Sequence, residues 1–309
     1  MNVILDIMPT ALKEILGKFN FESLNEIRLR AGAPIILSVS GKPYYLNSCG
    51  LSNNFEKDKT LRISQSDIET ILHKASNYSV YSVNDQIKQG YITIRGGIRI
   101  GIAGEVVTNN KEIVTIKNIQ SLNIRVPHEM RGCSYPVLNH IFDKHRPHRT
   151  LIISPPGCGK TTILRDLSWQ ISDKYHLLNT LIIDERGEIS ATHNGVPQLC
   201  VGEFTDIISG GTKHNGFENG VRSMRPDVVL TDEIITEGDI GMIYAASRSG
   251  VGVIATVHAS DIGEIRTKPG FDKLIENRIF DRYVVLGIGE KPGKIIGVYD
   301  SNLRPLALS

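Results

Sequence analysis

The feature that most constrains this chain of 309 residues is a strand–loop–helix segment near its midpoint. An apolar run, Leu151-Ile152-Ile153, leads into a loop with two glycines, Gly157 and Gly159, and a helical pattern follows from Lys160. Glycines let backbone N–H groups turn inward around a phosphate, and the N-terminus of the helix adds the positive end of its dipole. The segment is therefore typical of a phosphate-binding P-loop.

The loop differs from the pattern GxxxxGK[ST] at one position, because Ser154 stands where the first glycine is expected. We expect Lys160 to reach the β- and γ-phosphates of ATP and the Thr161 hydroxyl to bind Mg²⁺. The alternative is a strand–turn–helix with a surface lysine, which the flanking strand and helix disfavour. The predicted ATP-binding residues of the loop are Ser154, Pro155, Pro156, Gly157, Cys158, Gly159, Lys160, Thr161 and Thr162.

A second apolar run, Val228-Val229-Leu230-Thr231, ends in two carboxylates about 70 residues after the loop. In open α/β sheets, ligands bind at the carboxyl ends of the strands. We expect Asp232 to hold Mg²⁺ and Glu233 to orient and deprotonate the attacking water. A pair of acids after apolar residues is weak evidence alone, and its position downstream of the P-loop gives it meaning.

Two further apolar runs end in polar residues. Thr180-Leu181-Ile182-Ile183 leads into Asp184-Glu185-Arg186, and Gly252–Val257 leads into His258. For the first we predict a catalytic role for Glu185, with a surface turn carrying a Glu–Arg ion pair as the alternative. For the second we predict that His258 senses the γ-phosphate, with a core or turn histidine as the alternative.

The apolar runs alternate with helical segments from about residue 150, which favours a parallel-rich sheet buried on both faces. Residues 1–145 instead indicate a smaller α+β domain, and we place the link at the polar residues 143–149. The strands expected in the first domain are 26–30, 33–39, 113–116 and 121–126, with a hairpin over 90–102. A Gly41-Lys42-Pro43 turn, a loop over 47–60 and a helix capped at Ser66-Asp67 complete it. The fold class is thus α/β, with domains at 1–145 and 146–309.

Charge and cysteine usage narrow the classes of function. The net charge is +2, but residues 1–150 hold 19 basic and 13 acidic residues, a net of +6, and the rest has a net of −4. Near-balance argues against a histone-like nucleic-acid binder. The four cysteines are widely spaced, which favours neither a zinc site nor a disulfide framework. The N-terminus lacks the basic region and the cleavage site of a signal peptide, so we expect a cytoplasmic protein.

The four strand ends, in this order, resemble the Walker A, Asp box, Walker B and His box of the secretion-ATPase branch of the RecA-like P-loop superfamily. Other segments narrow this resemblance to the stage III sporulation protein AA family of endospore-forming Firmicutes. They occur in both halves of the chain, from about residue 20 to Leu286: Asn25–Arg30, Gly101–Gly104, Leu122–Val126, Asp184–Ile189, Arg222–Val229 and Asp232–Ile234.

The resemblance implies a hexameric ATPase in the mother cell, peripheral to the membrane through inner-membrane partners. It would power or assemble a channel complex between mother cell and forespore. It also implies that an arginine of the first domain reaches the phosphates. Arg125 is the best candidate, followed by Arg95 and Arg99, and the alternative is that all three are solvated strand residues. Two segments depart from the family: residues 207–216 lack its Pro-Lys step, and Ile235 replaces a glycine.

Two other functions stay open at the level of sequence. One is a RecA-like ATPase that binds single-stranded nucleic acid through the basic first half, although Tyr78, Tyr81 and Tyr91 interleave poorly with its arginines. The other is a scaffold that binds ATP but scarcely hydrolyses it. We favour the motor, with ATP and Mg²⁺ as cofactors and nucleic acid as an unlikely partner.

Overall fold

The computed structural model describes residues 2–19, 21–77, 79, 83–110, 112–143, 146–176, 178–289 and 292–308. The chain forms two compact units. The first comprises residues 1–128 and 191–198, and the second comprises residues 129–190 and 199–309. Among the predicted features, Tyr78, Tyr81 and part of the 143–149 link lie outside the described residues.

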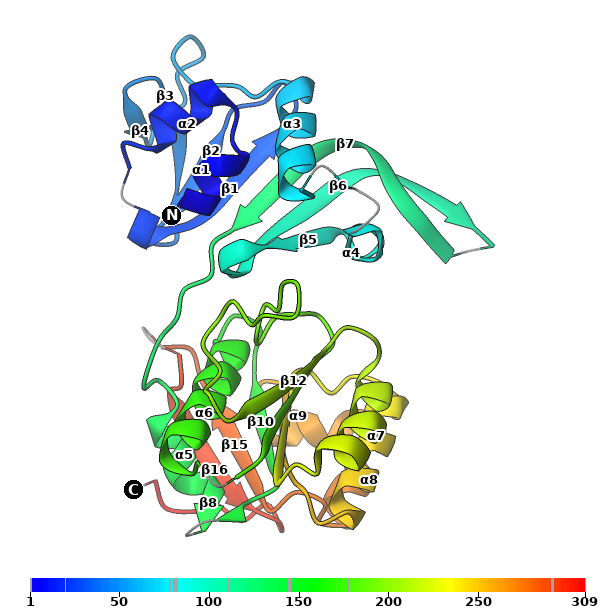
Figure 1. Ribbon diagram of the computed structural model, residues 1–309. Helices are drawn as coiled ribbons and strands as arrows, with labels where there is room; N and C mark the ends of the chain where they lie inside the picture. The colour runs from blue at the N-terminus through cyan, green and yellow to red at the C-terminus, as the bar shows by residue number, and fades with distance from the viewer. Residues whose placement is uncertain are drawn as a thin grey trace. The chain divides into compact units, whose positions relative to one another are not determined.

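The first unit is an antiparallel sheet covered by short helices (Figure 1). In the described residues its strand order is β4-β3-β2-β1-β7-β6-β5, and every neighbouring pair is antiparallel. The bounds are α1 Asn2–Ile7, α2 Thr10–Leu16, η1 Phe21–Ser23, β1 Leu24–Arg30, β2 Ile36–Val39, β3 Lys42–Asn47, β4 Gly50–Ser52, α3 Gln65–Ala75, α4 Asn84–Lys88, β5 Tyr91–Ile94, η3 Arg95–Gly97, β6 Ile98–Asn109 and β7 Glu112–Arg125.

Strand β1 shows why this unit folds as it does. Ile27 and Leu29 are buried in the core, while Arg28 and Arg30 on the other face are exposed. This alternation is the pattern of a strand with one face against a core. The predicted hairpin over 90–102 is present as β5 and β6 with η3 as its turn.

Four local expectations differ from the structure. The helix α3 is capped by Ser64 rather than Ser66, because the Ser64 side chain accepts from Asp67 N and the Asp67 side chain accepts from Ser64 N. Strand β3 already begins at Lys42, so the turn before it is Ser40-Gly41, both with positive φ. The predicted loop 47–60 contains β4, and the two strands predicted over 113–126 are one strand, β7.

The second unit is a sheet with helices on both faces. Its strand order in the described residues is β12-β11-β13-β14-β10-β15-β16, parallel throughout except for the last pair. The bounds are α5 Tyr135–Ile141, β8 Phe142–Asp143, β9 Arg146–Pro147, β10 Thr150–Ser154, α6 Lys160–Lys174, β11 Thr180–Asp184, β12 Thr205–Ser209, α7 Lys213–Met224, β13 Val228–Thr231, α8 Glu237–Arg248, β14 Gly252–His258, α9 Ile262–Thr267, α10 Phe271–Glu276, β15 Arg282–Leu286 and β16 Ile295–Asp300.

The central strands are apolar over their whole length because both faces are covered. Every residue of β10, β11 and β13 is buried. One core cluster joins the sheet to α7, α8, α9 and α10, and the other joins it to α5 and α6, which lie on the opposite face (Figure 1). The predicted parallel-rich α/β fold, preceded by a smaller α+β part, is therefore present.

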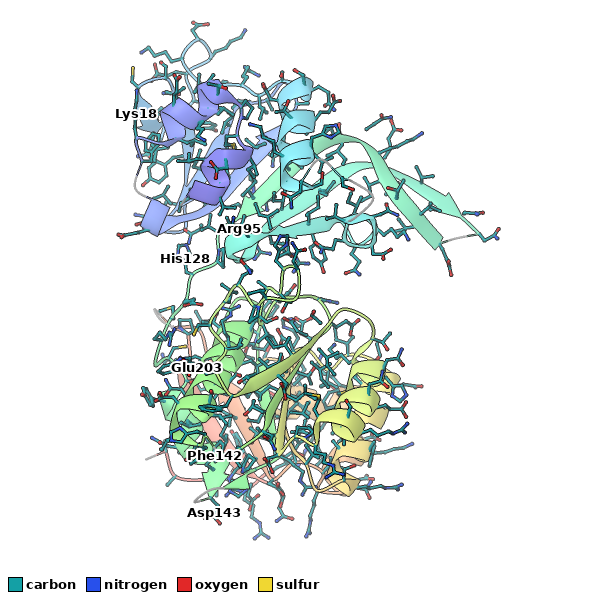
Figure 2. All side chains as sticks on the ribbon, in the orientation of Figure 1. Lys18, Arg95, His128, Phe142, Asp143 and Glu203 are labelled. Atoms are coloured by element: carbon teal, nitrogen blue, oxygen red, sulfur yellow. The ribbon has the colours of Figure 1, made fainter. Side chains whose placement is uncertain are left out.

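The compact units divide at a different place from the predicted domains. The second unit begins at Glu129 rather than at residue 146, because α5 buries Val137, Leu138 and Ile141 in the same core cluster as α6. Part of the predicted link forms the short β8–β9 pair, which follows α5 directly; Figure 2 labels Phe142 and Asp143 there. Where independently folding domains divide stays a prediction.

Candidate functional site

The P-loop occupies residues 155–159, between the end of β10 and the start of α6. Gly157 and Gly159 both have φ +81, a left-handed conformation that glycine adopts without strain. The space beside Gly157 is open, whereas a Cβ on Gly159 would lie 2.6 Å from Pro292 Cβ. Gly159 has no side chain to cap α6, so this 15-residue helix presents its first N–H groups to the loop. The loop thus has the shape of an anion site.

Lys160 is buried and turned back into its own loop. Its Nζ donates to the carbonyl oxygens of Ser154 (3.3 Å) and Pro155 (3.2 Å), and lies 2.8 Å from His258 Nδ1. Burial lowers the pKa of Lys160, while the charges of Asp232 and Glu233 act in the opposite direction. The ammonium is therefore held on a long apolar stem at the end of β10, where the P-loop begins.

Ser154, the departure from the P-loop pattern, is compatible with this arrangement. Its side chain is fully buried and its Oγ donates to Pro155 O at 3.0 Å. Cys158, within the loop, is also buried. Thr162 lies one residue beyond Thr161 in α6, where it lines a narrow pocket with Arg131, Arg165 and Trp169.

Asp232 directly follows β13 and meets the hydroxyl of Thr161. Thr161 Oγ1 donates to Asp232 Oδ2 at 2.5 Å, and Thr256 Oγ1 of β14 donates to Asp232 Oδ1. Oxygen ligands suit Mg²⁺, which keeps several waters and takes only one or two carboxylates together with substrate phosphates. The described residues contain no cluster of three or more His, Cys, Asp or Glu that could hold a metal alone. The Thr161–Asp232 pair fits a Mg²⁺ shared with a phosphate.

Glu233 has an unusual backbone and a well-held carboxylate. Its φ is +42, in the left-handed region that costs a non-glycine residue about 1–2 kcal/mol. Its N–H donates to Asp232 Oδ1 (3.0 Å) and Thr256 Oγ1 (2.9 Å). Its carboxylate contacts His258 Nε2 through Oε1 and accepts from Arg186 Nη1 at 3.2 Å through Oε2. His258 thus links Glu233 to Lys160.

The edge of the sheet explains why these residues meet. Ser154 pairs with His258 in the parallel register of β10 and β14, and Thr231 pairs with Ala255 in that of β13 and β14. Carboxyl ends of adjacent parallel strands lie at one edge. The structure therefore brings together Lys160, Thr161, Asp232, Glu233 and His258.

The Asp184-Glu185-Arg186 segment follows β11 at the same edge. Asp184 is buried, and its carboxylate accepts from the N–H groups of residues 188, 189 and 190 and from Ser190 Oγ. Glu185 lies 3.5 Å from Lys213 Nζ, with 37% of its side chain exposed. Arg186 forms an ion pair with Glu233, and the catalytic role of Glu185 stays a prediction.

Sequence reasoning missed two parts of the site. Lys213, the first residue of α7, is buried and donates to Glu233 O at 2.7 Å. A cavity of about 620 Å³ lies beside the loop, lined by residues 129–133, 136, 289 and 292–294. Pro292 joins this cavity to the P-loop through its contact with Gly159. Its size suits a small-molecule ligand. A buried lysine has no local signal in the sequence, and the cavity is built from two distant segments.

The arginines predicted to reach the phosphates belong to the first unit. Arg125 ends β7, where it is exposed and pairs in register with Glu26 and Arg99. Arg99 Cζ lies 3.7 Å from the centre of the Tyr91 ring, and Arg95 lies in the turn between β5 and β6 (Figure 2). Their role at the phosphates stays a prediction. Tyr91 is buried, so its ring does not form an exposed platform for stacking a base.

Solved structures share this fold over most of the chain. The ATPase DotB of Yersinia pseudotuberculosis is 14% identical, with a TM-score of 0.59 over 94% of this chain and 79% of that one. The pilus retraction motor PilT, solved with bound ADP, is 15% identical, with a TM-score of 0.57 over 92% of this chain and 78% of that one. The fold is that of the P-loop secretion ATPases, and the predicted fold class is confirmed.

The chain itself belongs to the family described as sporulation stage III, protein AA, whose model matches residues 1–305. The stage III sporulation protein AA of Bacillus subtilis strain 168 is 35% identical over 308 residues, which cover 98% of this chain and 96% of that protein. The resemblance drawn from the sequence motifs is therefore confirmed. Among the described residues, none of the helices is both long and apolar enough to cross a membrane.

Proposed function

We propose that the chain hydrolyses ATP to ADP and phosphate at the carboxyl edge of the second sheet, with Mg²⁺ as cofactor. The observation that carries this proposal is the meeting of a P-loop lysine and threonine with the acids that follow β13 and the histidine that ends β14. Phosphoryl transfer to water asks a protein mainly to position groups and to offset charge, and this edge supplies both.

Each residue then has a role. The loop N–H groups and the start of α6 bind the phosphates, and Lys160 turns from His258 towards the β- and γ-phosphates. Thr161 and Asp232 hold Mg²⁺, which offsets negative charge on the phosphates when bound. Glu233 accepts a proton from the attacking water as the bond from the γ-phosphorus to the leaving oxygen breaks. Once Lys160 has turned away from it, His258 senses the γ-phosphate. Glu185 acts as a second catalytic glutamate at the same ends of the strands.

The remaining parts of the nucleotide fit features beside the loop. We assign the base and ribose to the 620 Å³ cavity that Pro292 joins to Gly159. One wall of this cavity is hydrogen-bonded to α6, because Asp166 accepts from Gly132 N (2.9 Å) and Ser134 N (2.7 Å). We further assign the role of reaching the phosphates from the first domain to Arg125, with Arg95 and Arg99 as the next candidates.

The family and the fold suggest a wider role. We propose a homo-oligomeric ring, a hexamer, that works in the cytoplasm of the mother cell and binds inner-membrane proteins of a sporulation channel complex. Support comes from the family match and from the fold shared with DotB, an ATPase, and PilT, a motor. The net charges of +6 and −4 in the two halves suit copies that meet head to tail.

Phosphate release from ATP in the presence of Mg²⁺ tests the activity. We expect Lys160→Ala to lower kcat by about 100-fold or more, because it removes a fixed charge at the transferring phosphoryl group. Lys174→Ala, at the exposed far end of the same helix, is the matched control and keeps the wild-type rate. Wild-type turnover in Lys160→Ala would refute the mechanism.

The mass of the protein in solution with and without Mg²⁺ and ATP tests the ring, and a monomer under both conditions contradicts it.

A further inference from the structure

Lys213 occupies a position that is costly for a lysine. It is 8% exposed and is the first residue of α7, where the positive end of the helix dipole disfavours a cation. A buried charge is tolerated in a fold when it is paired and hydrogen-bonded. The partners of Lys213 therefore show what its burial achieves.

These partners come from three separate segments. Lys213 Nζ donates to Glu233 O at 2.7 Å, lies 3.5 Å from Glu185 Oε2, and lies 4.0 Å from Asp239 Oδ2. Glu185 follows β11, Glu233 follows β13, and Asp239 lies in the first turn of α8. The Lys213 ammonium thus connects the acidic residues that follow β11 and β13 to the first turn of α8.

The bond to Glu233 acts on a strained residue. Glu233 has φ +42, and its carbonyl oxygen faces the ammonium while its N–H is held by Asp232 and Thr256. Strained backbone persists only where surrounding contacts hold it. Asp239 restrains the next residues, since its Oδ2 accepts from the N–H groups of residues 235 and 236 at 2.9 Å each. Lys213 therefore contacts both the strained peptide and the carboxylate that anchors residues 235 and 236.

A small cavity lies at this place. It has a volume of about 10 Å³ and is lined by residues 183–186, 188, 213, 232 and 233. That is about the space that one water molecule needs. Glu185, Glu233 and Lys213 are among its lining residues and carry the polar groups that a bound water needs.

We propose that Lys213 is a positioning residue for hydrolysis, which holds Glu233 in its left-handed conformation so that the carboxylate faces the attacking water. The inference rests on the proposed function, because it gives Lys213 a task only if Glu233 is the base. Lys213 acts through Glu233 and does not contact the phosphates. Its removal therefore lowers the rate of the chemical step and leaves nucleotide binding in place.

Lys213→Met tests this, because methionine fills a similar volume without a charge or a donor. We expect kcat for ATP to fall by about 100-fold, the loss typical of a misplaced catalytic group, with KM changed less than about twofold. Lys213→Arg, which keeps the charge, recovers at least part of the rate. Lys273→Met, an exposed lysine of α10, is the control and keeps the wild-type rate. Should Lys213→Met fail to fold, Lys213→Gln is expected to show the same fall in kcat at unchanged KM.

A double-variant cycle separates positioning from a structural role. In the Glu233→Gln background, Lys213→Met should cause little further loss of kcat, because the group it positions is already gone. If the kcat of the double variant falls by the product of the two single-variant losses, or if Lys213→Met keeps the wild-type kcat, the inference is overturned. Either result leaves the proposed function standing.

Hydrogen exchange of residues 232–236 adds a readout that does not depend on turnover. We expect faster exchange in Lys213→Met than in the wild type, since the segment loses its restraint. If the wild type releases no phosphate, the proposed function fails. Faster exchange would then still support the restraint by Lys213, and unchanged exchange would overturn it as well.

Discussion

Strands β11 and β13 are neighbours in the second sheet; β11 ends in Asp184, β13 is followed directly by Asp232, and a glutamate comes after each aspartate. Their carboxylates are nevertheless satisfied in different ways. Asp184 accepts from three backbone N–H groups and from Ser190 Oγ, all within the turn that follows it. Asp232 accepts from the hydroxyls of Thr161 and Thr256, which belong to other elements, and, among the described residues, from only one backbone N–H, that of Glu233.

The donors around each aspartate decide which carboxylate is available for a ligand. Backbone donors cannot leave Asp184 without unfolding the turn at residues 185–190, so its charge stabilises the fold. A hydroxyl can rotate and become a metal ligand itself, so the pair of Thr161 with Asp232 can open to admit Mg²⁺. The two glutamates also differ in their contacts. Glu233 is held by His258 and Arg186 at the P-loop, whereas Glu185 lies beside Lys213.

The largest effect is expected at the second strand end. Glu233→Gln should lower kcat for ATP by about 10³-fold, because the amide cannot take the proton of the attacking water. Binding of a fluorescent ATP analogue should be kept, since the P-loop is intact. Glu276→Gln, an exposed position of α10, is the control for the loss of one carboxylate. A Glu233→Gln variant that turns over at the wild-type rate would show that the base is another residue.

A large effect on stability is expected at the first strand end. Asp184→Asn should lower the free energy of unfolding by about 3 kcal/mol, because a buried charged acceptor is lost and at least one backbone N–H then faces an amide N–H₂. The single tryptophan, Trp169, lies in α6, so its fluorescence during urea unfolding reports on the second unit. Asp232→Asn should change this free energy by less than half as much. Equal losses in the two variants would remove the distinction between the two aspartates.

The strand ends also differ in how much of their structure could be predicted from the sequence. The central strands and the P-loop were predictable, because strands covered on both faces are apolar along their length and the glycine loop is a local signal. Because the strands were expected to be parallel, their four carboxyl ends were also expected to meet at one edge of the sheet. The link from Lys160 through His258 to Glu233 was not predictable, since it depends on side-chain distances across three elements.

Two other features were hidden for a related reason. Lys213 lies 20 residues before Glu233 in a glycine-rich stretch, and lysine is rarely buried, so composition favoured the surface. The assignment of α5 to the second unit depends on packing against α6, which its own sequence does not record. The hydrophobic periodicity of one segment carries no information about which distant segment it packs against.

The smallest effect is expected at the amino ends of the strands of the same sheet, where the Asp281 carboxylate is satisfied by one residue, Arg149, through its guanidinium and its backbone N–H. Asp281 accepts from Arg149 Nη2 at 2.8 Å and from Arg149 Nε at 3.0 Å, just before β15 and β10 begin. Burial acts to raise the pKa of Asp281, but the hydrogen bonds from Arg149 outweigh it and hold the pKa below its ordinary value of 3.8. The native state therefore binds fewer protons than the unfolded state near this pH, so the pair stabilises the fold above it.

Asp281→Asn should accordingly lower the free energy of unfolding by about 1 kcal/mol near neutral pH, a modest loss because the pair is partly exposed to solvent. The difference from the wild type should shrink as the pH falls through the lowered pKa of Asp281, because the native carboxylate is then protonated. Trp169 fluorescence during urea unfolding at several pH values measures this. ATP binding should not change, since the five residues of β10 place Arg149 about 17 Å from the P-loop. A loss that stays constant into acid would show that Asp281 stabilises the fold through packing rather than charge.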